Sequence, residues 1–469
     1  MENNKGQWSS NFGFLMAAIG SAVGLGNIWG FPYKMGANGG GAFLLVYVIL
    51  VVFVGFAVML GELTIGRKTG KGAVGAYRAL NKKLPWVGYM GVGSAFLILG
   101  FYSVLGGMVM RYMLGFLVNM FGGAGFAAEG FFGSWIANMP GMVGFYALFM
   151  LLNIVIVMGG ISGGIEKFSK VAMPALAVML VTVIVYVACQ PGAMEGYKFM
   201  FVPDFSVFDS LKSFFDVLKS AAGQMFFSLS LGMGAMITYG SYLDRKENIQ
   251  KNGLLIVVMD SMVAFMAALC VLPARFALDP EGSLGGPSLL FVTMQNVFSR
   301  MGTVGPIFGI IFYLLVVFAA ISSSISLLEV IVAHFVDKAR AEGKGDKRKS
   351  YTLIATALVS IGCILVCADA LGTSGISPAD LLGIENPKTW AADWLDFWDC
   401  ISEGIMMPLG ALLMTFMVAY EIGTEFVKDE IEQCGNKFTM YKFYRFCIRY
   451  VTPLGLLLVL YGQIKSFFF

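Results

Sequence analysis

The stretch Gly20–Asn27 (GSAVGLGN) decides the fold, because it interrupts an apolar segment, 12–31, that is long enough to cross a membrane. A second stretch, Phe226–Gly234 (FFSLSLGMG), interrupts the apolar segment 214–239 in the same way. Each glycine weakens a helix by about 1 kcal/mol relative to alanine. Lipid cannot satisfy peptide groups that leave a helix, so these groups must line a cavity enclosed by protein. Two interrupted spans of this kind are typical of a transporter's binding site.

The composition is that of an integral membrane protein. Of the 469 residues, 58% are hydrophobic and 13% are charged, whereas a soluble globular chain is about 25% charged. Apolar runs of about 18 residues or more recur along the chain, and each is a candidate transmembrane helix. The sequence therefore predicts an all-α polytopic membrane protein. Its eleven predicted spans lie at about 12–32, 41–66, 86–118, 142–160, 165–189, 213–240, 251–273, 304–336, 351–371, 397–424 and 446–465.

The positions of the two interruptions predict an internal repeat. They fall in the first and sixth spans, so each opens a block of five helices, and the odd spacing gives the two blocks opposite orientations in the membrane. We predict one membrane domain, 1–469. It would hold a first inverted repeat at 12–189, a second at 213–424 and an appended span at 446–465.

Basic residues predict the orientation. With a cytoplasmic N-terminus, the loops on that side carry 23 of the 32 Lys and Arg residues, as the positive-inside rule requires. Eleven spans then place the C-terminus outside. The polar N-terminus has no signal-peptide pattern, so we expect a multi-pass protein of the cell (plasma) membrane. The basic cytoplasmic segments are Lys5, 67–83, 167–170, 245–251, 338–349 and 428–449.

The number and spacing of the histidine and cysteine residues argue against an enzyme. His334 is the only histidine, and the seven cysteines lack the spacing of a metal site. A membrane enzyme would need a nucleophile and a base clustered in the cavity. We therefore expect neither an enzyme nor an organic cofactor.

The motifs around the first interruption resemble the neurotransmitter:sodium symporter family. The family usually has twelve spans, and an eleven-span chain is similar to bacterial amino-acid:sodium symporters. The resemblance implies the leucine-transporter fold, for which inverted repeats with interrupted helices are described. The matching stretches are Ser21–Tyr33, Asn38–Phe43, Gly61-Glu62, Phe101–Ser103, Gly160–Lys167, Gln224–Ser230 and Ser322–Ser324.

The resemblance implies an amino-acid site between the interrupted spans. N–H groups near Leu25 and Gly26, at the positive end of a helix dipole, would bind the carboxylate together with the Tyr102 hydroxyl. Carbonyls around Ala22 and Phe227 would receive the ammonium. The predicted substrate-binding residues are Ser21, Ala22, Leu25, Gly26, Ile98, Tyr102, Phe227, Ser228, Ser230, Met233, Ser323 and Leu327.

The resemblance also implies two sodium sites. Sodium is a hard cation that backbone carbonyls and hydroxyls can coordinate. In the first site the ion would also touch the substrate carboxylate, which would couple the two. The first predicted site is formed by Ala22, Asn27, Ser228 and Asp260. The second is formed by Gly20, Val23, Ala319, Ser322 and Ser323.

Asp260 is a point of variation within the family, because some members have Asn there and animal members balance the charge with chloride. An aspartate in an apolar span costs about 3 kcal/mol unless it is compensated. We predict that a bound sodium compensates it and that chloride is not needed. A protonated carboxyl in helix packing, or proton-coupled transport with Asp260 as the carrier, is the alternative.

Gate residues are also implied by the resemblance. On the cytoplasmic side they are Lys5, Trp8, Tyr242 and Asp337, and on the outer side they are Gln224 and Asp396. Lys5 stands where arginine is usual, so a bidentate pair is lost. Position 30 holds Gly where the outer gate has Arg, and Lys34 lies beyond Pro32.

Together these expectations describe sodium-coupled uptake of a neutral amino acid by alternating access. Met233, where an aromatic residue often lies, favours a hydrophobic or aromatic L-amino acid, and glycine or alanine is the alternative substrate. A non-transporting amino-acid receptor is less favoured, because the sequence has no soluble signalling domain. The expected partners are the amino acid, sodium and the bilayer, with no nucleic acid, and the oligomeric state stays open.

Overall fold

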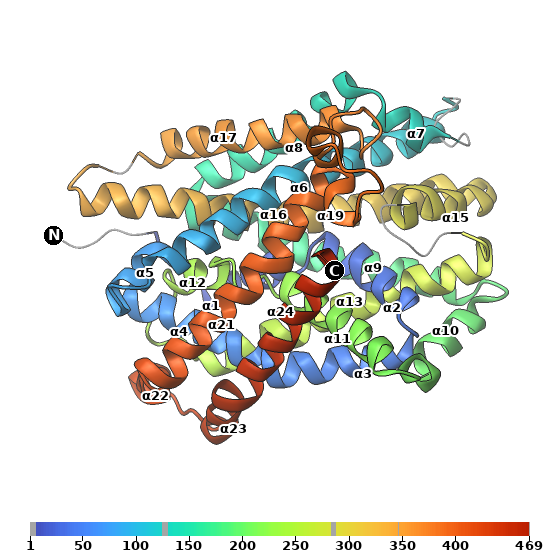
Figure 1. Cartoon of the computed structure of the whole chain (residues 1–469). Coiled ribbons are helices and arrows are strands. Elements are labelled where there is room, and N and C mark those ends of the chain that lie inside the picture. Colours follow the sequence, from blue (N-terminus) through green and yellow to red (C-terminus); the bar gives the residue numbers. More distant parts are fainter. Residues whose placement is uncertain (1–5, 124–129, 283–287, 346, 469) are drawn as a thin grey trace.

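A computed structural model describes residues 6–123, 130–282, 288–345 and 347–468 (Figure 1). These residues are almost entirely helical, and the single β-bridge among them joins Gly40 to Pro203. The predicted all-α class is therefore confirmed.

Nine continuous helical segments of the described residues are long and apolar enough to cross a membrane. Each segment overlaps one predicted span: four of them match the second to fifth spans, and five match the seventh to eleventh. The segments are Gly41–Thr69, Pro85–Met120, Met139–Met158, Ile161–Ala188, Ile249–Leu278, Gly302–Ala341, Arg348–Asp369, Trp394–Glu421 and Tyr441–Lys465.

Some of these segments combine several elements, with short π-helical turns (η) between α-helices. The elements of the nine segments are α3 (Gly41–Leu50), η2 (Val51–Gly55), α4 (Phe56–Thr69), α6 (Pro85–Met120), α8 (Met139–Met158), η3 (Ile161–Ile165), α9 (Glu166–Ala188), α13 (Ile249–Leu278), α16 (Gly305–Ala341), α17 (Arg348–Asp369), α20 (Trp394–Asp399), η7 (Cys400–Met406), α21 (Met407–Phe416), η8 (Met417–Glu421), α23 (Tyr441–Phe446), η10 (Cys447–Val451) and α24 (Thr452–Phe468). The connections contain α5 (Ala73–Leu80), α7 (Phe131–Ile136), α10 (Ala193–Phe201), α15 (Met294–Arg300), α18 (Pro378–Leu382), α19 (Thr389–Ala392) and α22 (Thr424–Ile431).

The first predicted span is broken where the glycines predict. Helix α1 (Asn11–Ala22) is capped by the Ser10 side chain and is followed by Val23, which is extended with ψ 103°. The chain resumes as η1 (Gly26–Gly30) and α2 (Phe31–Ala37), at 52° to α1. A Cβ at Gly24 would lie 2.6 Å from the Tyr102 hydroxyl, so the close approach requires glycine.

The sixth predicted span is also broken. Helix α11 (Leu211–Ser228) and helix α12 (Ala235–Gly240) are separated by six residues. Within the break, Ser230, Gly232 and Gly234 have φ of 53°, 80° and 77°, a region that glycine adopts at little cost. With these two interrupted spans added to the nine continuous segments, the described residues account for the predicted eleven.

The two breaks lie at the centre of the protein. Helix α1 packs against α9, α13 and α16, while α12 packs against α4 and α16, and the residues of both breaks are almost all buried. In Figure 1 the helices α5, α22 and α23 lie at one end of the molecule, and α7, α10 and α15 lie at the other. The first end carries loops predicted to be cytoplasmic, so we name the two the predicted cytoplasmic end and the predicted outer end.

Candidate functional site

A small inner cavity of about 20 Å³ lies between the two breaks. Ten of the twelve predicted substrate-binding residues line it, together with Gly24, and their role in binding stays a prediction. Leu25 lines a larger cavity instead, and Ser228 points to Asp260. The lining residues are Ser21, Ala22, Gly24, Gly26, Ile98, Tyr102, Phe227, Ser230, Met233, Ser323 and Leu327.

One end of the inner cavity presents hydrogen-bond donors. The Leu25 N–H, released from the helix by the break, donates to the Tyr102 hydroxyl at 2.9 Å. The Gly24 N–H donates to Asn27 Oδ1 at 3.1 Å. The tyrosine hydroxyl and the Leu25 N–H could turn to an incoming carboxylate, which makes stronger hydrogen bonds than a neutral acceptor.

The inner cavity is also lined by Ser21, whose backbone carbonyl is an acceptor. The Ser21 carbonyl accepts from Ser230 Oγ at 2.9 Å and from Ser323 Oγ at 3.1 Å. The side chains of Ile98, Met233 and Leu327 form apolar wall. The cavity thus combines donors, acceptors and apolar surface, as an amphiphilic zwitterion requires.

Three of the four residues predicted for the first sodium site lie together. Asn27 Nδ2 donates to Asp260 Oδ1 at 2.7 Å, and Ser228 Oγ donates to Asp260 Oδ2 at 2.8 Å. Asp260 is completely buried, and both of these donors are neutral. A buried carboxylate is costly unless a charge compensates it, so this group suits a cation beside the cavity-lining Ala22.

All five residues predicted for the second sodium site also lie together. Ser322 Oγ lies 2.9 Å from the Ala319 carbonyl oxygen and 3.3 Å from that of Val23. Ser323 Oγ lies 3.3 Å from the Gly20 carbonyl oxygen and 3.2 Å from that of Val23. Carbonyls and hydroxyls without a carboxylate suit a hard monovalent cation.

A conventional metal centre is absent from the part of the chain that the structure describes, where no three His, Cys, Asp or Glu residues are grouped to hold an ion.

The third serine of the stretch Ser322–Ser324 joins two helices and is not part of the predicted sodium site. Ser324 Oγ donates to the buried Asn153 Oδ1 at 2.5 Å, which joins α16 to α8.

Two of the predicted cytoplasmic gate residues, Trp8 and Tyr242, contact each other and neighbouring polar residues. Trp8 Nε1 donates to the Tyr239 carbonyl at 3.1 Å, and its ring centroid lies 6.3 Å from that of Tyr242. Tyr242 donates to Glu329 Oε1 at 2.8 Å, and Glu329 forms an ion pair with Arg348. These contacts join the N-terminal segment to α16 and α17 at the predicted cytoplasmic end.

The predicted gate pair of Lys5 with Asp337 stays a prediction, because Lys5 lies outside the described residues. Asp337 Oδ2 accepts a hydrogen bond from the Gly72 N–H at 2.6 Å. This bond joins α16 to the connection before α5.

Three acidic residues, Glu166, Glu62 and Glu329, form contacts that join the elements around the site. Glu166 accepts from the Ser9 N–H at 2.7 Å and pairs with Lys170 at 2.6 Å, which fixes the segment before α1 to α9. Glu62 Oε1 accepts from the released Gly232 N–H at 2.7 Å. Glu329 is the third. Glu166 and Glu329 were missed as site residues, and for Glu329 an acidic residue in an apolar run was the available signal.

A larger cavity of about 780 Å³ adjoins the inner one, and we name it the outer cavity because its lining includes Phe132 of α7, at the predicted outer end. Gly26, Tyr102 and Phe227 line both cavities, so they form the boundary between them. Gln224 Nε2 donates to the Gly26 carbonyl at 2.8 Å, and Asp396 lines the outer cavity. The two predicted outer gate residues thus lie at this cavity, while their gating role stays a prediction.

Broken helices around a buried, oxygen-rich site define a membrane transporter. A family model for the sodium:neurotransmitter symporter family matches residues 5–122 and 136–468. The uncharacterized sodium-dependent transporter YhdH of Bacillus subtilis is 35% identical over 463 residues, covering 97% of this chain and 96% of YhdH. An uncharacterized sodium-dependent transporter of Haemophilus influenzae is 32% identical over 473 residues, covering 97% of this chain and 98% of that protein.

A solved structure agrees with the family match. The crystal structure of MhsT in complex with L-phenylalanine has a TM-score of 0.84 and 34% sequence identity, covering 98% of this chain and 100% of MhsT. This chain belongs to the sodium:neurotransmitter symporter family, with its leucine-transporter fold and sodium dependence. It is a multi-pass membrane transporter and not an enzyme.

Proposed function

We propose that this transporter couples the entry of two sodium ions to the uptake of a neutral, hydrophobic or aromatic L-amino acid by alternating access. One observation carries the proposal above the others. The released Leu25 N–H donates at 2.9 Å to the Tyr102 hydroxyl, and Tyr102 lines the inner cavity, whose walls include Ile98, Met233 and Leu327. An α-amino acid with an apolar side chain matches this arrangement.

The substrate class is supported by a relative and by the pocket itself. MhsT, which is similar over almost the whole chain, is solved with L-phenylalanine. Met233 has a flexible side chain that can move to fit bulky ligands. Phe227, on the boundary of the two cavities, offers an aromatic face.

Glycine or alanine is the second candidate substrate, and the volume of the inner cavity favours it. A cavity of about 20 Å³ holds about one water molecule. Side chains must therefore move to admit any amino acid, and the movement is smaller for a smaller substrate.

The arrangement of the ion sites supports coupling. Asn27 bonds both Asp260 and the N–H of Gly24, which lines the inner cavity, so a sodium ion held by Asp260 and Asn27 would lie close to the substrate carboxylate. Two sodium ions that each cross a tenfold gradient and about 100 mV supply roughly 7 kcal/mol. That energy supports accumulation on the order of 10⁵-fold.

Uptake by proteoliposomes tests the proposal. Labelled L-phenylalanine and labelled glycine are offered with an inward sodium gradient, and choline replaces sodium in the control. We expect uptake of phenylalanine in sodium and background uptake in choline, with no change when gluconate replaces chloride, because Asp260 supplies the negative charge. Uptake driven by a proton gradient in choline would contradict sodium coupling, and preference for glycine would favour the second candidate.

A further inference from the structure

An ion pair bridges the outer cavity. Lys34 Nζ lies 3.3 Å from Glu403 Oε1, and both residues line the cavity. Lys34 belongs to α2, which is the outer half of the interrupted first span, and Glu403 belongs to η7 in the segment Trp394–Glu421. The pair therefore joins two spans that are far apart in the sequence, above the Tyr102 and Phe227 boundary.

Gly30, where the outer gate implied by the resemblance has Arg, lies close to Gln224. Gln224 is held by its bond to the Gly26 carbonyl, and a Cβ at Gly30 would lie 3.2 Å from Gln224 Oε1. A side chain at position 30 would therefore require Gln224 Oε1 to shift by a few tenths of an ångström. Lys34 follows four residues later on the same helical face.

The same cavity contains a second lysine that makes no such bridge. Lys219 pairs at 3.6 Å with Asp216, which lies three residues earlier on the same helix, α11. The two lysines line one cavity and have the same charge and the same exposed side-chain fraction, 22%. They differ in that the Lys34 pair crosses the cavity.

The pair is stable only while α2 and η7 stay close. Glu403 lies within a membrane span and its side chain is 11% exposed. Its carboxyl group also hydrogen-bonds the Asp399 side chain, so this acidic pair needs the positive charge of Lys34. The Lys34 carbonyl accepts from Asn38, whose side chain also donates to Ser220 of α11 at 3.1 Å. Movement of α2 away from η7 would separate the two charges and expose both to water.

We propose that Lys34 and Glu403 form the outer gate of this transporter. Their ion pair holds the outer cavity closed over the Tyr102 and Phe227 boundary, and it breaks before the substrate enters from the outside. This role goes beyond the proposed function, because it does not depend on which amino acid is carried.

The reaction of a reporter cysteine tests the gate. Leu105 lines the outer cavity three residues after Tyr102 on α6, so Leu105→Cys reports access to the cavity floor. The exposed Cys189 and Cys434 are first replaced by serine. The rate of modification by a water-soluble thiol reagent is then measured on purified protein without substrate.

We expect Lys34→Gln and Glu403→Gln each to raise the modification rate severalfold. The charge swap Lys34→Glu with Glu403→Lys should return the rate toward that of the parent, and Lys34→Arg should keep it. Lys219→Gln is the matched control and should leave the rate unchanged.

Three results would overturn the gate. The first is an unchanged rate in both single variants, the second is an equal increase in Lys219→Gln, and the third is a swap variant as fast as the single variants. If one of the single variants does not fold, the rate of the other single variant, compared with Lys219→Gln, still decides. Because the readout is access and not transport, it stands apart from any failure of the proposed substrate.

Discussion

Replacing Asp260 by asparagine is expected to weaken the sodium activation of transport about 100-fold in chloride-free medium, a change of about 2.8 kcal/mol. The buried carboxylate accepts hydrogen bonds from Asn27 and Ser228, which are neutral. Unit charges about 4 Å apart attract by roughly 4 kcal/mol at an effective dielectric of 20. Loss of the charge therefore removes enough attraction to account for the change.

Chloride should restore part of the sodium activation in Asp260→Asn, because a bound anion can replace the missing charge. Uptake is titrated with sodium in chloride and in gluconate. Asp279→Asn is the control, since Asp279 is a buried carboxylate at the C-terminal end of the same helix and pairs with Arg300 at 2.9 Å. An unchanged half-saturating sodium concentration, with no effect of chloride, would refute the role of Asp260.

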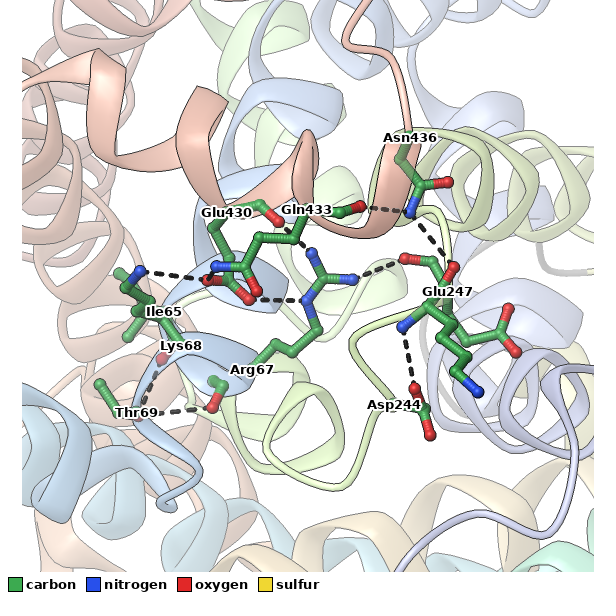
Figure 2. A network of polar contacts seen from close by, with 11 residues as sticks. Ile65, Arg67, Lys68, Thr69, Asp244, Glu247, Glu430, Gln433 and Asn436 are labelled. Carbon is green, nitrogen blue, oxygen red and sulfur yellow. Dashed lines mark hydrogen bonds and ion pairs between the residues drawn. The ribbon is translucent and has the colours of Figure 1, made fainter.

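Removing one partner of the Arg67–Glu430 pair is expected to destabilise the folded protein by about 3–5 kcal/mol. Figure 2 shows the Arg67 guanidinium between Glu430 and the backbone of Glu247. Arg67 Nε lies 2.9 Å from Glu430 Oε1, and both side chains are 1% exposed. Arg67 also donates to the Glu247 carbonyl at 2.5 Å, and Gln433 donates to Glu430 at 2.8 Å.

This network joins α4 to α22 and to the connection after α12, at the predicted cytoplasmic end. Glu430→Gln leaves the buried guanidinium without its counter-charge, while Arg67→Met with Glu430→Leu removes both charges. We therefore expect the single variant to unfold at a lower temperature than the double variant, since an apolar replacement of both partners is often neutral.

Thermal unfolding of the purified protein in detergent measures the difference. Glu195→Gln is the matched control, because Glu195 pairs with Lys198 at 3.1 Å while both side chains are more than half exposed. Exposed pairs contribute about 0–1 kcal/mol. Equal effects of Glu430→Gln and Glu195→Gln would show that the buried network does not stabilise the fold.

The fold was predictable because its signals are local. The length of each apolar run predicts a span, and the glycines at Gly20–Gly26 and Gly232–Gly234 predict where two spans break. Those breaks in turn predicted an enclosed polar cavity, because released backbone at the centre of a membrane protein must have partners. The particular residues of that cavity, Tyr102 and Asp260 among them, were implied by the family resemblance.

The partners of charged side chains were not predictable in the same way. Lys34 and Glu403 are 369 residues apart, and Arg67 and Glu430 are 363 apart. An acidic residue in an apolar run indicates that a partner exists but not which residue it is. Only the packing of the spans brings these charges together.

The central claim is that a sodium ion and an amino acid together bind the backbone N–H and C=O groups that the breaks in the two spans release. The most direct measurement is the thermal stability of the purified protein with each of the twenty amino acids, in sodium and in choline at equal ionic strength. We expect at least one neutral amino acid to raise the unfolding temperature in sodium and to have no effect in choline. An equal rise in both salts, or no rise in either, would contradict the claim.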